Sequence, residues 1–574
     1  SLLEDPMSQT SASTVPNSGE SGPRLSYIHN PGRKPLKYLT IGNLIENAAG
    51  AFGEKCALVS VVDNRRVSYK EILHQSDKLA AGFSNLGLEK GDRIGLWAPN
   101  IVEWVIAFIA SARAGLTTVV LDPTYEPIEL KNALVKCKVK AIICPDEYKD
   151  LHFYDKLCDL LPEIATCDGE ILRTNSVSTL KTIIIISERR LRGTYSYSDV
   201  MNLTDVVAKI SSPVSPDDIC MILFSSGTTG KPKAICLRHF QVVNNSYVTG
   251  KRLQLCTSGQ IYSVQVPLFH VFGVIGCLLA ATHFGSTLVF PSPLYNSKAN
   301  LQALVAERCT IVCGTPTMFV DLLTVQKKQY QKLWLKQALI GAAPCTLDLI
   351  QRIKRNLKIN RVEIVYGSTE MTGIAFQSIT DCNSFEGWGY IGDHVEAKVV
   401  DANHNLVPFG SPGELWVRGY LIMAEYYDEP EQTKIDVNES NWFKTGDLFV
   451  LNEDGHGKVV GRLKDVVIRG GETICPGEVE EVLNTHPDIL EAYVIGIGHE
   501  RLGEELCACV KLEAGATLNL SSLRQFCAGK ISTQKIPTQL RVVDSFPKTT
   551  SGKIQKSKLR DQFSAKSVYF HGVI

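Results

Sequence analysis

The stretch Phe224-Ser-Ser-Gly-Thr-Thr-Gly-Lys-Pro-Lys-Ala234 is the most informative segment of this chain. It follows the apolar run of residues 220–223, which predicts a buried strand, and precedes residues 239–252, which can form a helix. Its glycines let the backbone turn with N–H groups inward, while hydroxyl and lysine side chains add donors and positive charge. We therefore expect a loop that wraps a polyphosphate, formed by Ser225, Ser226, Gly227, Thr228, Thr229, Gly230, Lys231 and Lys233.

Two other interpretations of this stretch must be weighed against a polyphosphate loop. A loop rich in Gly, Ser, Thr and Lys is often only a solvated turn. A nucleotide-triphosphatase P-loop needs Gly, four residues and then Gly-Lys-Ser/Thr, whereas here Pro232 follows the lysine. The stretch therefore predicts a phosphate cradle of another family, and the remaining motifs must identify that family.

Length and composition predict a large globular protein with more than one domain. A chain of 574 residues is too long for one ordinary core. Its 60 Lys plus Arg equal its 60 Asp plus Glu, so net charge gives no argument for a nucleic-acid or anionic-membrane partner. The 17 cysteines are scattered, many within apolar runs, which favours buried thiols in a reducing compartment. No apolar run approaches the roughly 18–20 residues of a membrane-spanning helix.

The ends of the chain contain no recognisable targeting signal. Residues 1–30 are expected to be disordered, and residues 1–6 are interpreted as an added remnant ahead of Met7. Residues 7–24 contain a single Arg, which makes a poor mitochondrial presequence, and the last residues are not a Ser-Lys-Leu signal. We expect an intracellular protein, with the cytoplasm favoured and the mitochondrion as the alternative.

Apolar strand-like runs alternate with helix-like segments along most of the chain. Residues 38–210 show this alternation, with strands expected at 93–97, 117–121 and 182–186. It resumes after the glycine-rich stretch, with helices expected at 273–283 and 347–357 and a strand at 287–290. Such alternation predicts α/β layers with parallel strands. Ligands of open α/β sheets bind beyond the C-terminal ends of strands, and the loops 225–233, 341–344 and 366–370 follow three such ends. Their convergence predicts one site.

The last third of the chain has a different pattern. Short strands at 396–400 and 413–418, with turns between them, predict a small β-subdomain. About a hundred residues beyond Lys464 then form a compact α+β pattern with the size of a separate domain. The predicted architecture is an α/β N-terminal domain over 31–463 that includes the β-subdomain, and a small α+β C-terminal domain over 464–574.

Eight motifs follow one another along the chain, at 225–233, 267–270, 341–344, 366–370, 413–415, 445–447, 461–465 and 551–553. In this order they resemble the acyl-adenylate-forming superfamily, which includes acyl-CoA synthetases, firefly luciferase and peptide-synthetase adenylation domains, and the resemblance runs from about 40 to 565. Within this superfamily, Arg469-Gly470-Gly471-Glu472 looks like the branch of medium-chain and aryl acyl-CoA synthetases. Residues 242–246, 314–321 and 551–556 look most similar to animal medium-chain acyl-CoA synthetases.

The resemblance implies a two-step reaction that uses ATP, Mg²⁺ and coenzyme A. A carboxylate attacks the α-phosphate of ATP to give an acyl-adenylate and pyrophosphate, and a thiol then displaces AMP. Both steps build negative charge on phosphate oxygens, so oriented N–H groups, cations and Mg²⁺ should supply most of the catalysis.

The resemblance also implies roles for single residues. Thr228 would contact phosphate oxygens and, with Glu370, belong to the Mg²⁺ site. Lys553 would bridge the substrate carboxylate and the α-phosphate, and His270 would line the acyl pocket or gate the thiol path. Asp447 would accept both ribose hydroxyls. The other implied nucleotide or coenzyme A contacts are Gly341, Ala342, Ala343, Tyr366, Gly367, Ser368, Thr369, Arg462, Lys464, Gly470, Gly471 and Glu472.

Lys464 matches the hinge of the superfamily, whose members use one domain arrangement for adenylation and a rotated one for thioester formation. Rotation would withdraw Lys553 and bring residues 469–472 to the thiol tunnel. One position departs from the common pattern, because Ala234 stands where a glycine usually follows Pro-Lys. We expect a modest effect on the loop.

The expected acyl pocket is mostly apolar and contains no Lys or Arg, which favours an apolar tail over a dicarboxylic or amino acid. We predict a medium-chain fatty acid as substrate and keep arylalkanoates as the alternative. The pocket is expected to involve Phe269, His270, Phe272, Thr315, Phe319, Gly341 and Met371.

Two rival functions stay open at this point. The first is an adenylating oxygenase of the luciferase type, which shares the first half-reaction. The second is a non-catalytic protein that keeps the fold and binds nucleotide or acyl-CoA, although Lys553, Glu370 and Asp447 argue against it. The expected partners are small molecules, with no nucleic acid and no integral membrane segment; the oligomeric state is not predicted.

Overall fold

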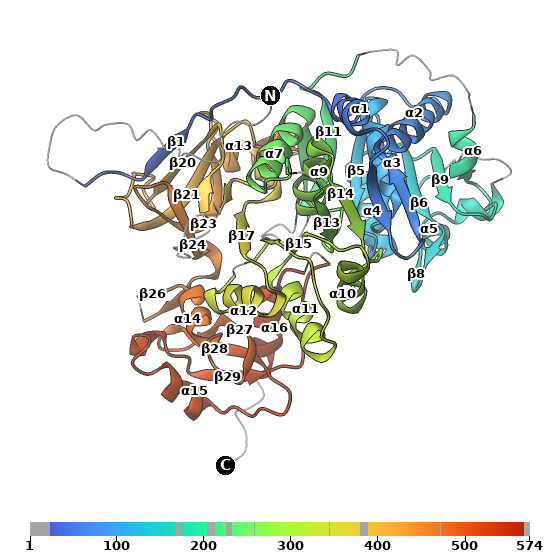
Figure 1. Cartoon of the computed structure of the whole chain (residues 1–574). Helices are drawn as coiled ribbons and strands as arrows, with labels where there is room; N and C mark the ends of the chain where they lie inside the picture. The colour runs from blue at the N-terminus through green and yellow to red at the C-terminus, as the bar shows by residue number, and fades with distance from the viewer. Residues whose placement is uncertain are drawn as a thin grey trace.

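The computed structural model of the chain describes residues 23–167, 172, 174–203, 213–225, 232–257, 259–343, 345–378, 389–470, 472–550 and 552–567. Two large sheets with their helices form the N-terminal part, and a third sheet forms a smaller C-terminal domain, drawn in orange and red in Figure 1. The predicted α/β fold class with a small C-terminal domain is confirmed. Within the described part of the chain, no helix combines the length and apolarity needed to cross a membrane.

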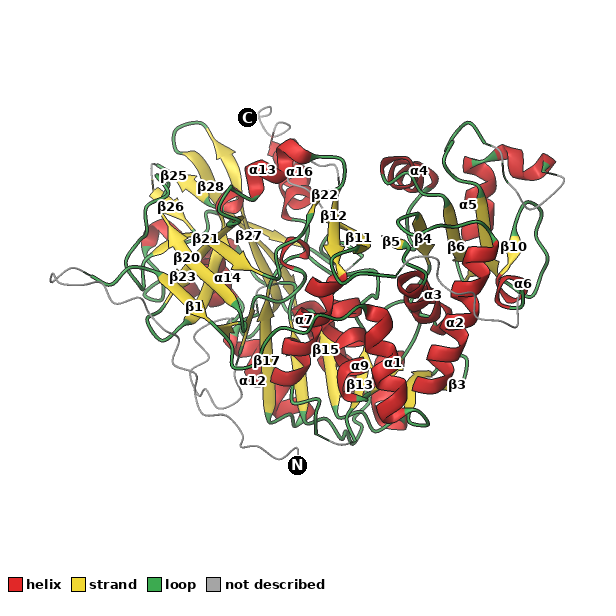
Figure 2. Cartoon of the chain, turned by 90° about the horizontal axis from the view of Figure 1, so that it is seen from above, coloured by secondary structure: helices red, strands yellow, loops and turns green. Residues whose placement is uncertain are grey.

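An eight-stranded sheet forms the first layer, with the strand order β10-β9-β6-β4-β5-β11-β12-β22. Its strands from β10 to β11 run parallel. Neighbouring residues of β5 pack into different hydrophobic cores: Val120 packs with helices α2 and α3, whereas Val119 packs with α4 and α5. Helices therefore cover both faces, as Figure 2 shows. The elements are α2 (Tyr69–Asn85), α3 (Val102–Arg113), α4 (Pro127–Lys136), α5 (Phe153–Leu160), α6 (Tyr197–Met201), β4 (Arg93–Trp97), β5 (Thr117–Leu121), β6 (Ala141–Pro145), β9 (Thr182–Ile186), β10 (Tyr195–Ser196), β11 (Ile219–Ser225), β12 (Lys233–Arg238) and β22 (Glu425–Tyr426).

The glycine-rich stretch has different neighbours from those predicted. We expected it to connect a strand directly to a helix, but β12 follows it and pairs antiparallel with β11 before helix α7 (His239–Arg252) begins. The apolar residues of β12, such as Ile235 and Leu237, are fully buried, which explains why this segment joins the sheet. Ala234, where the family usually has glycine, is also buried in β12.

A fourteen-stranded sheet forms the second layer, in the order β1-β20-β21-β23-β24-β19-β18-β17-β16-β15-β13-β14-β2-β3. Its strands from β17 to β2 are parallel and follow helices, whereas the predicted β-subdomain continues the same sheet from β18 onwards with antiparallel strands. The strands are β1 (Tyr27–Asn30), β2 (Cys56–Ser60), β3 (Arg65–Ser68), β13 (Ile261–Val264), β14 (Thr287–Phe290), β15 (Ile311–Gly314), β16 (Gln337–Ile340), β17 (Arg361–Tyr366), β18 (Phe376–Gln377), β19 (Gly389–Ile391), β20 (Val395–Val400), β21 (Pro412–Gly419), β23 (Phe443–Leu451) and β24 (His456–Arg462).

Two segments of this layer differ from the expectation. Residues 27–30, placed by the sequence in a disordered N-terminus, form β1, because Ile28 is fully buried where β1 pairs with β20. The helix expected over 273–283 is continuous, but its middle, Val274–Leu279, is a π-helix between α8 (Val271–Gly273) and α9 (Ala280–Phe284). The other helices around this sheet are α1 (Ile41–Phe52), α10 (Ser297–Ala306), α11 (Pro316–Lys328), α12 (Leu347–Leu357) and α13 (Pro430–Asp436).

The C-terminal domain has its own sheet and its own core. Strands β26, β25, β28 and β27 lie in this order, and β29 pairs with β28. Apolar side chains such as Val494, Val510 and Leu523 form a core separate from those of the large sheets. The elements are β25 (Val467–Arg469), β26 (Glu472–Ile474), β27 (Ile489–His499), β28 (Gly503–Leu512), β29 (Gln539–Val542), α14 (Pro476–Leu483), α15 (Leu520–Cys527) and α16 (Lys556–Ser567).

Candidate active site

A cleft of about 1020 Å³ lies between the fourteen-stranded sheet and the C-terminal domain. Strands β16 and β17 are neighbours in the sheet, so the loops that follow them open into the same cleft, and the neighbours β23 and β24 supply a second wall. Seven of the residues expected at a nucleotide site line this cleft: Ala342, Ala343, Tyr366, Gly367, Asp447, Arg462 and Lys553.

Asp447 is the polar centre of one wall of the cleft. The hydroxyl of Tyr366 donates to its Oδ2 at 2.7 Å, and Nε of Arg462 lies 3.0 Å from its Oδ1. Arg462 faces Asp447 because the two are paired residues of β23 and β24. The Asp447 side chain is buried, and this burial raises its pKa, against the opposing effects of Arg462 and of the Tyr366 hydrogen bond. Each carboxylate oxygen can still accept a further hydrogen bond.

Hydrogen bonds between the motifs 413–415 and 445–447 hold Asp447 in place. The backbone N–H of Gly446, which has φ 68°, donates to Oε1 of Glu414 at 3.1 Å. The hydroxyl of Thr445 donates to the carbonyl of Leu415 at 2.8 Å. The segment 413–415 therefore fixes the turn that presents Asp447, which explains why the two motifs occur together.

Lys553 reaches this cleft from the C-terminal domain. Burial and the neighbouring Arg462 lower its pKa to about 8, while Glu370 and Asp447 oppose the shift. The same ammonium group helps burial to lower the pKa of His270 to about 3. No hydrogen bond or ion pair joins Lys553 Nζ to any residue that the structure describes. A desolvated cation without a partner lies at the centre of the predicted site.

Glu370 lies on the side of the site where the glycine-rich stretch starts. It lies in the 3₁₀ turn Thr369–Met371 after β17, and its Oε1 accepts hydrogen bonds from Ser225 and Tyr426, each at 3.4 Å. Ser225 is the last residue of β11, so the glycine-rich stretch begins beside Glu370. Lys233, near the end of the stretch, forms an ion pair with Asp436 at 2.7 Å and does not line the cleft. This ion pair connects the first residue of β12 to the last residue of α13.

The middle of the glycine-rich stretch and one residue of the thiol-side segment lie outside the described residues. The expected phosphate contacts concerned are Ser226, Gly227, Thr228, Thr229, Gly230 and Lys231, together with Gly471 of the later segment. The described ends of the stretch, Ser225 and Lys233, connect it to Glu370 and to Asp436 respectively.

Comparison with known proteins identifies this arrangement. The profile of the family described as AMP-binding enzyme matches residues 45–427, and that of the AMP-binding enzyme C-terminal domain matches residues 478–553. The chain belongs to the AMP-binding enzyme family. The membership predicted from the eight motifs is confirmed; β23 and β24, which carry Asp447 and Arg462, lie between the two matched regions.

Curated relatives of this AMP-binding enzyme are named as acyl-CoA ligases. The mitochondrial medium-chain acyl-CoA ligase ACSF2 of Danio rerio is 36% identical over 553 residues, which are 94% of this chain and 90% of the relative. The ligase of the same name from Homo sapiens is 36% identical over 552 residues, with the same coverage. The putative acyl-CoA synthetase YngI of Bacillus subtilis is 33% identical over 538 residues, 92% of this chain and 97% of the relative.

Solved structures share the fold at lower identity. The anthranilate CoA ligase AuaEII in complex with anthranoyl-AMP superposes with a TM-score of 0.84 at 22% identity, covering 93% of this chain and 99% of that one. ATP-bound MatB from Rhodopseudomonas palustris has a TM-score of 0.80 at 24% identity, with coverage of 92% and 99%. At these identities the comparison establishes the fold alone.

The residues expected on the acyl side of this AMP-binding enzyme lie in different surroundings. Phe272 is buried, and its ring is at ordinary contact distance, 3.5 Å, from the position that a Cβ on Gly341 would occupy; Val365 Cγ2 would be only 2.6 Å from that position, so a side chain at Gly341 would displace Val365. Phe319, expected in the pocket, is fully buried in the hydrophobic core. Met371 is also fully buried. Phe269 lines a separate cavity with Pro267.

Asn100 is a residue of this region that the sequence analysis missed. Its Nδ2 donates to the carbonyl of Val266 at 2.9 Å, and its Oδ1 accepts the N–H of Leu268 at 2.8 Å. These bonds hold the turn before His270, whose Nδ1 accepts the N–H of Phe272 at the start of α8. Asn100 lies about 170 residues earlier in the sequence, so only the fold reveals this contact.

The expected hinge turn borders the cleft through Asp465, whereas the described residues of the thiol-side segment do not line it. Lys464 is in the 3₁₀ turn Leu463–Asp465, where burial and Arg462 lower its pKa. Arg469 pairs with Glu505 at 2.9 Å, and neither it nor Glu472 lines the cleft that Lys553 enters. In this arrangement the C-terminal domain therefore presents its lysine and not its glycine-rich segment.

The residues present fit a bound Mg²⁺ that is held mainly by phosphate and water. The described part of the chain contains no group of three or more His, Cys, Asp or Glu side chains that could hold a metal alone. Mg²⁺ in phosphate-transferring sites commonly uses one or two carboxylates with phosphates and waters. Glu370 can supply that carboxylate, and the buried hydroxyl of Ser368, two residues away, has no hydrogen-bond partner among the described residues.

Proposed function

We propose that this AMP-binding enzyme is an acyl-CoA ligase that joins a medium-chain fatty acid to coenzyme A through an acyl-adenylate. One observation carries the residue assignment: Lys553, a desolvated cation of the C-terminal domain that has no ion-pair partner among the described residues, lies beside Glu370, Asp447 and Arg462 of the N-terminal part. The family membership and the names of the full-length relatives support the acyl-CoA ligase activity.

Adenylation takes place in the cleft. ATP lies there with its adenine against Tyr366 and the Ala342-Ala343 wall, and its ribose hydroxyls donate to Asp447. The ammonium of Lys553 lies between the acid's carboxylate and the α-phosphate, where it offsets the charge that accumulates as the new oxygen–phosphorus bond forms. When bound, Mg²⁺ neutralises charge on the phosphates, and Glu370 would hold it.

Nucleophilic attack by the acid requires the carboxylate to be held close to phosphorus, and Lys553 can hold both groups at once because its ammonium has three donors. The buried Asp447 and the exposed Arg462 keep that end of the cleft polar without excess charge, since they form an ion pair. Exclusion of water when ATP and the acid fill the cleft would strengthen these interactions.

Thioester formation needs a second arrangement of the C-terminal domain. We place the domain boundary at Lys464, in the short turn that follows β24. Rotation there removes Lys553 from the cleft and brings Gly470 and Glu472 towards the acyl-adenylate, so that the thiol of coenzyme A attacks the acyl carbon and AMP leaves. The positive φ of Gly470, 60°, fits a segment whose backbone must approach a ligand closely.

A medium-chain acid is the favoured substrate, and the mitochondrion the favoured compartment. The relatives at 36% identity are named mitochondrial medium-chain acyl-CoA ligases. Phe272, Gly341 and Met371 offer no charge that could pair with a second carboxylate. The relatives' names favour the mitochondrial alternative over the cytoplasmic location that the sequence suggested.

The test is product identification. The purified chain is incubated with ATP, Mg²⁺, coenzyme A and an equimolar panel of C4–C18 fatty acids, arylalkanoates, dicarboxylic acids and amino acids, and thioesters are identified by mass spectrometry. We expect C6–C12 acyl-CoA, with AMP and pyrophosphate formed in equal amounts. A preference for an amino acid, or thioester formation without AMP, would contradict the proposal. Light emission with a luciferin and oxygen would support the rival oxygenase.

A further inference from the structure

We propose that Asp122 is a positioning residue for adenylation, which holds Lys553 in the cleft through a hydrogen bond to Thr550. This inference rests on the proposed function, because it concerns the half-reaction in which Lys553 acts. Thr550 Oγ1 donates to Asp122 Oδ2 between the two lobes of the enzyme. Asp122 follows β5 of the eight-stranded sheet, whereas Thr550 belongs to the C-terminal domain and precedes Lys553 by three residues.

The lysine loop, which we define by the described residues Thr549, Thr550, Gly552 and Lys553, is closed by backbone hydrogen bonds. The N–H of Thr549 donates to the carbonyl of Lys553 at 2.7 Å, and that of Gly552 donates to the carbonyl of Thr549 at 2.8 Å. The N–H of Lys553 donates to the hydroxyl of Thr549 at 3.0 Å. Because these bonds close the turn, a contact at Thr550 also fixes the position of Lys553.

Asp122, the acceptor of this hydrogen bond, is oriented by other hydrogen bonds within the N-terminal part. The other carboxylate oxygen of Asp122 accepts the backbone N–H of Thr124 at 2.9 Å and its hydroxyl at 2.7 Å. The carbonyl of Asp122 accepts Nε1 of Trp97 at 2.9 Å, and this fully buried indole packs edge-on against Phe153. Asp122 therefore presents one oriented oxygen to the incoming loop, at little cost in conformational entropy.

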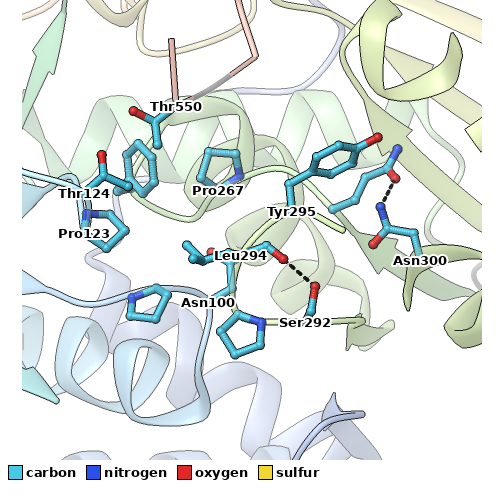
Figure 3. A pocket seen from close by; sticks show the side chains of 13 residues that line it. Asn100, Pro123, Thr124, Pro267, Ser292, Leu294, Tyr295, Asn300 and Thr550 are labelled. Atoms are coloured by element: carbon cyan, nitrogen blue, oxygen red, sulfur yellow. Dashed lines mark hydrogen bonds between the residues drawn. The ribbon is translucent and has the colours of Figure 1, made fainter. Parts of the chain in front are cut away.

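Packing alone does not hold this end of the loop. Figure 3 shows Thr550 beside Thr124 and Pro123 at the edge of a cavity of about 190 Å³, which extends towards Leu294 and Tyr295. At the other end of the turn, a Cβ on Gly552 would lie only 3.1 Å from Thr315 Oγ1, so the backbone there already touches the N-terminal domain. The loop is thus docked by a close backbone contact at Gly552 and by a hydrogen bond at Thr550.

This docking matters only while Lys553 is in the cleft. In the rotated arrangement of the proposed function the loop has left Asp122, so the hydrogen bond favours adenylation and contributes nothing to thioester formation. A hydrogen bond to a carboxylate that is partly open to solvent predicts an effect of about five- to tenfold on the adenylation rate when it is lost.

The experiment measures the two half-reactions separately in Thr550→Val, Thr550→Ser, Asp122→Ala and the double variant Asp122→Ala/Thr550→Val. Adenylation is followed as acid-dependent ATP–pyrophosphate exchange, and thioester formation as single-turnover reaction of preformed acyl-adenylate with coenzyme A. Two controls are used: Asp63→Ala removes a carboxylate that accepts a hydrogen bond from Ser60 in the turn between β2 and β3, and Thr517→Val changes an exposed threonine of the C-terminal domain.

We expect exchange to fall about five- to tenfold in Thr550→Val and in Asp122→Ala, and no further in the double variant, because both remove the same bond. Thr550→Ser and the two controls keep the original rate, and thioester formation is unchanged throughout. Additive losses, equal losses in both half-reactions, or no loss in Thr550→Val would each overturn the proposal.

A second measurement needs no catalysis, and it distinguishes failure of the proposed function from failure of the docking contact between Asp122 and Thr550. Hydrogen–deuterium exchange of peptides covering residues 545–556 is compared in the ligand-free proteins, and we expect faster exchange in Thr550→Val and Asp122→Ala than in the controls. If the unsubstituted chain activates no acid but these peptides respond as expected, the proposed function fails and the docking contact stands. If the chain is active but the peptides do not respond, the docking contact fails.

Discussion

The two sides of the cleft are built in different ways. The N-terminal side rests on strand ends of a continuous sheet, where Asp447 is bound by both Tyr366 and Arg462. The C-terminal side contributes one turn, and the side-chain ammonium of its Lys553 makes no ion pair or hydrogen bond with the described residues. The difference indicates a division of labour: a rigid surface orients the nucleotide, and a movable cation decides when the acid reacts.

The largest expected effect comes from removing the movable cation. Lys553→Ala should slow acid-dependent ATP–pyrophosphate exchange at least about 100-fold, because the developing charge loses its oriented donor. Thioester formation from preformed acyl-adenylate should change by less than about threefold in the same variant. The matched control is Lys556→Ala, which removes a nearby lysine of the C-terminal domain that pairs with Glu480. Equal losses in both half-reactions would remove the distinction between the two sides.

Asp447→Ala tests the rigid side and should have the next largest effect. It leaves the Arg462 guanidinium without its ion-pair partner and the Tyr366 hydroxyl without its acceptor, and it removes the group proposed to bind the ribose. We expect the KM for ATP to rise about 10- to 100-fold and thermal stability to fall. Tyr366→Phe keeps the carboxylate and serves as the milder comparison. An unchanged KM for ATP would place the nucleotide elsewhere.

Gly552→Ala probes the contact between the two sides and should cost about tenfold in adenylation. Gly552 has φ 84°, which is unfavourable for alanine by about 1–2 kcal/mol, and the added Cβ would lie 3.1 Å from Thr315 Oγ1. Gly515→Ala, at a positive-φ glycine of the same domain with nothing close to its Cβ position, controls for the backbone effect. An equal loss in the control would show that the contact with Thr315 is unimportant.

The smallest effect is the pH dependence of adenylation. The pKa of Lys553 is lowered to about 8 in the ligand-free protein, so its ammonium form is present below that pH and is lost above it. The kcat/KM for adenylation should therefore be halved near pH 8 and continue to fall as the pH rises, since kcat/KM reports the free enzyme. Lys553→Arg keeps its charge and should move this decline to higher pH. An unchanged profile in that variant would assign the titration to another group.

Local patterns predicted most individual elements. The strands at 93–97, 117–121, 182–186 and 287–290 and the helix at 347–357 were placed at the observed residues. In these segments, hydrophobic periodicity and turn residues agree with the tertiary structure. The strand β12 was missed because four buried residues after a glycine-rich loop give too short a pattern to distinguish from the loop itself.

The structure brings the residues expected on the nucleotide side together more clearly than those expected on the acyl side. Tyr366, Asp447, Arg462 and Lys553 occur in short ordered motifs, and all four line the same cleft. Phe319, expected in the acyl pocket, is fully buried in the hydrophobic core, and an apolar side chain has the same sequence signature in a core and in an apolar pocket. Asn100 and Asp122 were missed, since an Asn or Asp after a strand usually only forms a turn.

The sequence by itself determined the family, the α/β layers and the small C-terminal domain, and it named the charged residues that we propose act on the nucleotide. Only the tertiary structure decided that the β-subdomain extends the second sheet, that Glu414 holds the turn of Asp447, and that Asp122 meets Thr550 more than four hundred residues away. The reason is physical: motifs record which groups a reaction needs, whereas contacts between distant segments depend on how strands and domains pack, which no local pattern contains.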